Sequence, residues 1–211
     1  MFIIDFDDTL FNTHAFKQAR AQAVKGLGVS DELFWKTYKE AYNNDLGINV
    51  YSDERHAEIL ERYGFEKQAI LAAFEKIKLF LKDYLFSDAV DLLENLKKSG
   101  QKLILLSLGQ ADFQKVKIES VGISKYFDEV YTVDDTKEHI IANIINSCEP
   151  NERVWFINDK IEETKKLIQH FPRIKPLLKV SPAFSIEDYQ KSGIPFFSTW
   201  YDIKEYARQR F

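Results

Sequence analysis

Near its start the chain reads Phe2-Ile3-Ile4-Asp5-Phe6-Asp7-Asp8-Thr9-Leu10. A short continuous apolar run of this kind is typical of a strand buried on both faces of a parallel sheet. Residues two apart in an extended strand point to the same side, so we expect Asp5 and Asp7 to face one side and Asp8 the other. The sequence therefore predicts a buried strand that ends in a pair of carboxylates, with Asp8 in a structural role such as capping the next turn.

Similar apolar runs recur at residues 103–106, 130–133 and 154–157, and stretches with helical spacing separate them. In residues 87–100, for example, Ser87 is the expected N-cap, Leu92 and Leu96 share a face, and Gly100 ends the helix. Alternating strands and helices favour a doubly wound parallel sheet of the α/β class. We expect a last strand at residues 194–198 followed by a closing helix.

Residues 13–84 break this alternation because they contain helical patterns and no comparable strand run. Expected helices begin near Ser30 and Ser52, and a third covers residues 65–82. We therefore predict two units. An α/β core is formed by residues 1–12 and 85–211, and a helical insertion by residues 13–84.

Composition excludes several classes of function. The 211 residues include 29 Lys and Arg, 33 Asp and Glu and one cysteine, Cys148, with a formal net charge of -4. A single cysteine allows neither an internal disulfide nor a cysteine zinc cluster, so we expect a reducing, cytoplasmic location. The interleaved charges give no basic surface for nucleic acid or an anionic membrane. No apolar run approaches the roughly 18 residues of a membrane span, and no signal peptide is recognisable.

Polar side chains follow three of the predicted strands. In open α/β sheets, ligands bind beyond the carboxyl ends of the strands, where these side chains would meet. Any one of them could simply cap the following helix, but together they indicate a site. Two carboxylates as close as Asp5 and Asp7 are tolerated when a cation lies between them or when one is protonated. The residues concerned are Asp5, Asp7, Ser107, Asn158 and Asp159.

The run Asp5-Phe6-Asp7-Asp8-Thr9-Leu10 resembles the first motif of the haloacid dehalogenase (HAD) superfamily of phosphotransferases and hydrolases. The resemblance implies a Rossmann-like core and makes the insertion a helical cap of the C1 type. The other three motifs of the family are matched in order by Ser107, by Lys137, and by Asn158 and Asp159 with Glu163 four positions beyond.

Two positions depart from the family pattern. The fourth motif usually has Gly before its Asp and a second Asp four positions beyond, where this chain has Asn158 and Glu163. Glu162 is therefore an alternative for the second acidic position. Lys137 lacks the Pro that often follows the family's lysine, so Lys117 and Lys160 are alternatives to it.

The resemblance also implies a chemistry. Mg²⁺ would be held by Asp5, the backbone carbonyl of Asp7 and Asp159, and Ser107 and Lys137 would bind the phosphate. Asp5 would attack phosphorus to give an aspartyl phosphate, and Asp7 would act as general acid and base. A departing halide needs no proton, so Asp7 favours phosphate esters over halides as substrates. We therefore predict a Mg²⁺-dependent phosphoric monoester hydrolase acting on a small phosphorylated metabolite.

Two other functions remain open from the sequence. A phosphomutase or another HAD phosphotransferase would use the same residues, whereas a non-catalytic binding module would not require all of them. Phosphonatase-type lysines in the insertion are expected to be solvated instead, namely Lys17, Lys25 and Lys36. Further residues that could reach a substrate are expected to lie on the surface, namely His14, Arg20, Arg55 and His56. The aromatic residues at helical spacing are expected to form the core of the insertion, namely Phe34, Trp35, Tyr38 and Tyr42.

Overall fold

The computed structural model describes residues 1–42 and 51–209, and its centre is a six-stranded parallel sheet. The strands are β1 (Phe2–Ile4), β2 (Leu103–Leu108), β3 (Glu129–Val133), β4 (Val154–Asn158), β5 (Ile174–Lys179) and β6 (Phe196–Phe197). Their spatial order is β3-β2-β1-β4-β5-β6. The chain thus winds outward from β1 and returns to start again at β4, which confirms the predicted doubly wound α/β fold.

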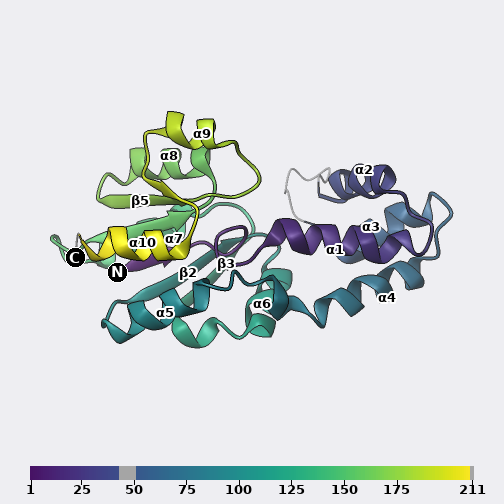
Figure 1. The fold of residues 1–211 in the computed structure, drawn as a ribbon, viewed down its shortest axis with the longest axis horizontal. Coiled ribbons are helices and arrows are strands. Elements are labelled where there is room, and N and C mark those ends of the chain that lie inside the picture. The colour runs from purple at the N-terminus through teal and green to yellow at the C-terminus, as the bar shows by residue number, and fades with distance from the viewer. Residues whose placement is uncertain (43–50, 210–211) are drawn as a thin grey trace.

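Helices cover both faces of this sheet, and a separate group of helices extends from one end of it (Figure 1). Around the sheet lie α5 (Ala89–Lys98), α6 (Ala111–Val121), η2 (Ser124–Tyr126), α7 (Glu138–Ser147), α8 (Ile161–His170), α9 (Ile186–Ser192) and α10 (Trp200–Arg208). The inserted helices are α1 (Thr13–Lys25), α2 (Asp31–Tyr42), α3 (Asp53–Glu61) and α4 (Lys67–Lys78), followed by the 3-10 turn η1 (Leu81–Tyr84). Among the described residues, no helix is long and apolar enough to cross a membrane.

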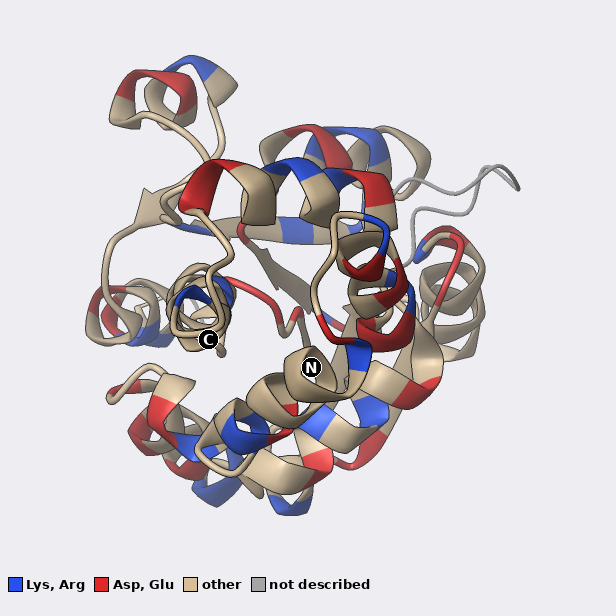
Figure 2. Ribbon diagram, turned by 90° about the vertical axis from the view of Figure 1, so that its right-hand side faces the viewer, with Lys and Arg blue, Asp and Glu red and all other residues tan. Residues whose placement is uncertain are grey.

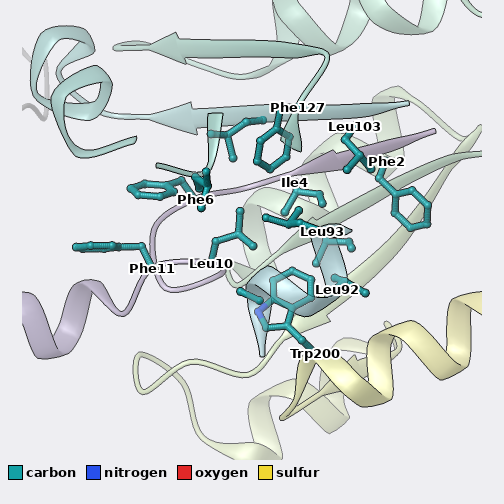
Figure 3. Packing of buried hydrophobic residues seen from close by; sticks show 14 of the residues in the cluster. Phe2, Ile4, Phe6, Leu10, Phe11, Leu92, Leu93, Leu103, Phe127 and Trp200 are labelled. Atoms are coloured by element: carbon teal, nitrogen blue, oxygen red, sulfur yellow. The ribbon is translucent and has the colours of Figure 1, made fainter. Parts of the chain in front are cut away.

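Alternate residues of β1 belong to two different hydrophobic clusters. Phe2 and Ile4 pack with α5, α6 and α10, where Trp200 is completely buried (Figure 3). Ile3 belongs to the opposite cluster, with side chains of α7 and α8. Burying one such side chain stabilises the fold by about 1.5 to 3 kcal/mol. The apolar run at residues 2–4 is continuous because both faces of its strand are covered.

Three details differ from the sequence predictions. Helix α5 begins at Ala89 and not after a Ser87 cap, because its N-cap is Asp88, whose carboxylate instead accepts a hydrogen bond from the Trp200 backbone (2.9 Å). The expected third helix of the insertion is broken between α4 and η1. That break has a physical reason, since Phe74 packs among the inserted helices while Leu81 packs in the cluster of the sheet. Strand β5 was missed because of its proline, Pro176.

The inserted helices have a hydrophobic cluster of their own, which contains no residue of the sheet. It is formed by Ala21, Val24, Val29, Phe34, Ala57, Leu60, Ile70 and Phe74. The two ends of the insertion lie side by side. Phe11 and Leu85 form an isolated antiparallel bridge, and the Asn12 backbone N–H donates to the Tyr84 carbonyl (2.7 Å).

A buried polar network joins these helices. The His56 ring is completely buried, with Nε2 2.9 Å from the Thr37 hydroxyl and Nδ1 2.9 Å from the Tyr51 hydroxyl. Thr37 donates its own proton to the Leu33 carbonyl (2.8 Å), so it accepts from Nε2 and the ring needs only one proton. Arg20 bonds Tyr51 as well as Asp53. Arg20 and His56 are therefore buried, and the prediction that they lie on the surface was wrong.

This network predicts an acid-sensitive fold. Burial and the neighbouring Arg20 guanidinium lower the pKa of His56 to about 3. As the pH falls, a histidine with a lowered folded-state pKa is protonated in the unfolded chain before it is protonated in the folded one. Its contribution to the free energy of unfolding is therefore present above about pH 6.5 and is lost at lower pH. Between about pH 7 and pH 4, wild type should lose about 3 kcal/mol more unfolding free energy than His56→Gln. Urea unfolding across this pH range measures it.

The matched control for this experiment is His170→Gln, at an exposed histidine at the end of α8. That variant should keep the pH dependence of the wild type. Parallel pH curves for wild type and His56→Gln would contradict the assignment of a neutral, buried His56.

Candidate active site

A cavity of about 340 Å³ lies between the carboxyl end of the sheet and the inserted helices. From the core it is lined by Asp5, Asp7, Asp8, Leu108, Gly109, Gln110, Phe113, Gln114, Lys117, Asp159 and Lys160. From the insertion it is lined by Thr13, Phe16, Lys17, Arg20, Tyr38, Lys39, Tyr42 and Tyr51. Its floor is the point between β1 and β4 where a doubly wound sheet places its ligands.

Asp5 follows β1 directly and is 3% exposed. Its Oδ1 is 2.6 Å from the Nζ of Lys137, the N-cap residue of α7, and its Oδ2 accepts a hydrogen bond from the Thr9 hydroxyl (3.2 Å). The Lys137 side chain is itself buried. The structure thus brings together the first and third motifs, which are 132 residues apart in the sequence.

Of the two candidates for the second acidic position, Glu163 is the one that contacts Lys137. Its Oε2 is 2.9 Å from Lys137 Nζ and accepts from the Asn158 side-chain amide (2.7 Å). Glu162 instead pairs with Lys165 on the exposed side of α8 (2.9 Å). Glu163 therefore helps to hold the lysine that contacts Asp5, and the Asn158 amide fills a supporting position.

Asp159 lies beside Asp5 with an unsatisfied oxygen. The residue is 3% exposed, and its Oδ1 has no hydrogen-bond partner among the described residues. Burial and the Asp5 carboxylate raise the pKa of Asp159 to about 8. Two buried carboxylates that close are expected to bind either a proton or a cation.

The donor set suits one Mg²⁺ ion. Four carboxylates and two lysines of the core line the cavity, which leaves two negative formal charges on that side. No group of three or more His, Cys, Asp or Glu side chains that could hold a metal occurs within residues 1–42 and 51–209. Mg²⁺ is usually bound by only one or two carboxylates, with water and substrate phosphate completing its shell. Asp5 and Asp159 are two carboxylates at the floor of the cavity and fit this pattern.

Asp7 is held by three donors. Its carboxylate accepts from the Thr13 hydroxyl, the Gln114 side-chain amide and the Lys117 ammonium. Burial raises the pKa of Asp7, but Lys117 and the other donors outweigh it and lower the pKa to about 2. Lys117 therefore pairs with Asp7 and not with Asp5, so it does not take the place of Lys137.

Gln114 and Thr13 are site residues that the sequence reasoning missed. Gln114 also donates to the Leu108 carbonyl (3.2 Å), and it packs so closely on Gly109 that a Cβ there would lie 2.5 Å from Gln114 Nε2. The available signal was the spacing of Gln114 and Lys117, three residues apart on one face of α6. This spacing alone does not identify a site, because the sequence does not show that Asp7 lies opposite that face of α6.

Ser107 lies at the same end of the sheet but does not line the cavity. Its side chain is completely buried near the end of β2, and its hydroxyl has no hydrogen-bond partner among the described residues. The next two residues, Leu108 and Gly109, do line the cavity. A buried hydroxyl without a partner is costly, so Ser107 is a polar group that the described residues leave unsatisfied next to the cavity lining.

Several other predicted positions fall around the cavity. Asp8 has a positive φ of 54° and accepts from the His14 backbone in the first turn of α1 (3.0 Å), the expected structural role. Lys160 lines the cavity beside Asp159, and Lys17 lines its opposite wall. Phe34 is in the core of the inserted helices, whereas Tyr42 is 40% exposed and lines the cavity with Tyr38.

Comparisons with known proteins bear on the family. The sequence model of the haloacid dehalogenase-like hydrolases matches residues 1–165. Over 143 residues the chain is 32% identical to the glyceraldehyde 3-phosphate phosphatase of Methanothermobacter thermautotrophicus. The alignment covers 62% of this chain and 61% of that protein, so the chain matches about three fifths of its curated relative.

Solved structures share the fold, and two of them serve as examples. One is described as a haloacid dehalogenase-like hydrolase from Burkholderia xenovorans LB400, with a TM-score of 0.68, 21% identity, and coverage of 97% of this chain and 94% of that one. The other is the HAD-hydrolase YfnB of Bacillus subtilis, bound to magnesium, with a TM-score of 0.54, 16% identity, and coverage of 84% and 85%.

Proposed function

Because the chain belongs to the haloacid dehalogenase-like hydrolases, we propose that this enzyme is a Mg²⁺-dependent phosphatase that hydrolyses small phosphorylated metabolites through an aspartyl phosphate. The observation that carries the proposal is the pair of buried carboxylates at the cavity floor. Asp5 contacts the buried Lys137, while Asp159 keeps an oxygen without a partner. The phosphatase activity of the matched relative and the magnesium in a structural neighbour support the same reading.

In this proposal Asp5 is the nucleophile. A carboxylate that approaches a phosphate dianion is repelled by about 4 kcal/mol per charge pair at 4 Å and an effective dielectric near 20. Mg²⁺, held by Asp5, Asp159 and the Asp7 carbonyl, would neutralise charge on the phosphoryl oxygens. Lys137 orients Asp5 and offers a second positive charge. Ser107 is kept as the proposed donor to a phosphoryl oxygen because its hydroxyl has no partner among the described residues, although it does not line the cavity in this structure.

Asp7 has the proton-transfer role. Its lowered pKa keeps it ionised, which suits the second step, where a base must take a proton from the attacking water. To protonate the leaving oxygen in the first step it must accept a proton from solvent or substrate.

The metal requirement is directly testable. After EDTA treatment and dialysis, hydrolysis of p-nitrophenyl phosphate should be lost, and Mg²⁺ should restore it. Asp159→Asn should raise the Mg²⁺ concentration for half-maximal activity at least about tenfold, because it removes a charged ligand. Calorimetry compares the Mg²⁺ affinities of wild type and Asp159→Asn directly, without turnover.

Asp135→Asn, at an exposed aspartate, is the matched control and should titrate like wild type. Full activity in EDTA would exclude the metal from the reaction.

A panel of phosphorylated metabolites would identify substrates, and product analysis would separate hydrolysis from phosphoryl transfer to a second sugar.

We also propose that residues 13–84 are a separate C1-type cap and that residues 1–12 and 85–211 fold without them. The adjacent ends of the insertion support this division, since Phe11 pairs with Leu85. A chain in which a short Gly-Ser linker joins Asn12 to Leu85 should unfold cooperatively and keep its α/β circular dichroism. Its phosphatase activity should fall, because one wall of the cavity is gone. A non-cooperative, unfolded product would contradict the division.

A further inference from the structure

The two sides of the cavity differ in charge. The core side carries four carboxylates, whereas the charged residues that line it from the inserted helices are all cationic: Lys17, Arg20 and Lys39. Figure 2 shows Lys and Arg mixed with Asp and Glu over the helices of this end of the molecule. An unmixed cationic wall is therefore a local property of the cavity and does not extend over the surface.

Arg20 is already neutralised, whereas Lys17 and Lys39 have no carboxylate partner within residues 1–42 and 51–209. Arg20 is ion-paired with the buried Asp53, which Lys78 also contacts (2.8 Å). Neither Lys17 nor Lys39 forms an ion pair with a carboxylate of the described residues. Asp8 interacts electrostatically with Lys17 without reaching ion-pair distance. These two lysines thus offer positive charge to a ligand.

The wall that carries Lys17 is built from packed aromatic rings. Lys17 Nζ lies 5.3 Å from the centre of the Tyr38 ring, and Tyr38 stacks on Tyr51 at 4.8 Å. Tyr51 in turn contacts Phe113 of the core, with ring centres 6.3 Å apart. The stack connects the inserted helices to the core beside the cavity, and Lys17 lies against it.

The position of Lys17 along α1 sets how far it lies from the proposed site of the leaving oxygen. Thr13 in the first turn bonds Asp7, the proposed acid for the leaving oxygen. Lys17 is one turn further on the same helix face, a rise of about 6 Å. A leaving group of about three carbons whose oxygen lies at Asp7 would therefore place its far end near Lys17.

We propose that Lys17 and Lys39 bind a second anionic group, a carboxylate or a further phosphate, on the leaving group of the substrate. The preferred substrates are then phosphate monoesters of small acids or small bisphosphates, of a size that a cavity of about 340 Å³ admits. This inference rests on the proposed phosphatase function and specifies its substrate class.

Matched substrate pairs test it. 3-Phosphoglycerate differs from glyceraldehyde 3-phosphate in having a carboxylate in place of the aldehyde, and glycerol 1,3-bisphosphate adds a phosphate to glycerol 1-phosphate. For at least one pair, kcat/KM should be about tenfold or more higher for the anionic member, mainly through a lower KM. The pair that responds identifies the anion as carboxylate or phosphate.

Variants assign the preference to the lysines. Lys17→Gln and Lys39→Gln should each lower the ratio of kcat/KM within the responding pair, and the double variant should abolish the preference. Lys36→Gln, on α2 outside the cavity, is the matched control and should retain the ratio of the wild type.

Two results would overturn the inference while the proposed function stands: hydrolysis of p-nitrophenyl phosphate with Mg²⁺ but no preference for either anionic substrate, or a preference that survives in the double variant. Absence of any phosphatase activity would overturn both.

Discussion

Replacing Asp5 by Asn should reduce kcat by on the order of 10⁴-fold or more for every phosphate ester, because the amide has no charge and cannot form an acyl phosphate. The fold should be retained. The amide oxygen can still accept from Thr9, and Lys137 keeps Glu163 as its counter-charge. Steady-state kinetics, with thermal unfolding to check the fold, measure the effect.

Asp8→Asn is the matched control for this loss. Asp8 is three residues away and lines the same cavity, but its carboxylate contacts the first turn of α1 and has no proposed chemical role. Its activity should stay within about tenfold of wild type. Comparable losses in both variants would mean that negative charge in the cavity matters more than a nucleophile at position 5.

Replacing Asp7 by Asn should produce the second largest effect, and its size should depend on the leaving group. For alkyl phosphates the loss should be about 10²- to 10⁴-fold, or about 3 to 5 kcal/mol, as is typical of general acid-base catalysis. p-Nitrophenolate is a weak base and needs little protonation, so the first step should suffer less with p-nitrophenyl phosphate. The slower water-activation step should then let the aspartyl phosphate accumulate.

Gln114→Leu provides a comparison for Asp7→Asn. It removes one of the three donors to the Asp7 carboxylate but leaves the carboxylate and Lys117 in place. Its loss should be smaller and similar for both kinds of substrate. Equal losses for both substrates in Asp7→Asn, with no accumulated intermediate, would indicate that Asp7 serves to place the metal or to organise the loop.

The strands that are easiest to predict are those with a continuous apolar run. β1, β2 and β4 are covered on both faces, so every residue of each apolar run is buried and hydrophobic. β5 escaped because Pro176 usually argues against a strand. β6 pairs with β5 at Leu178 and Lys179. Pro176 lies before this paired stretch, so on the β6 side of β5 its missing N–H costs no strand pairing among the described residues.

The site could be predicted in part for a related reason. Asp5, Asp7 and Asp159 follow strands, and parallel strands bring their carboxyl ends to one edge whatever the loops do. The partners of Asp7 could not be found this way. Lys117 and Gln114 lie more than 100 residues from it, and their contact depends on how α6 packs against the first loop. The burial of Arg20 and His56 depends similarly on the packing of four inserted helices.

The central claim is that Asp5 carries the phosphoryl group during turnover, and chemical trapping tests it most directly. Wild-type enzyme mixed with Mg²⁺ and substrate is quenched within one turnover and treated with borohydride, which reduces an acyl phosphate to an alcohol. Peptide mass spectrometry should then find homoserine at position 5, and Asp7→Asn should increase its yield. Modification at Asp7 or Asp159, or hydrolysis with no modified residue in either protein, would contradict the account.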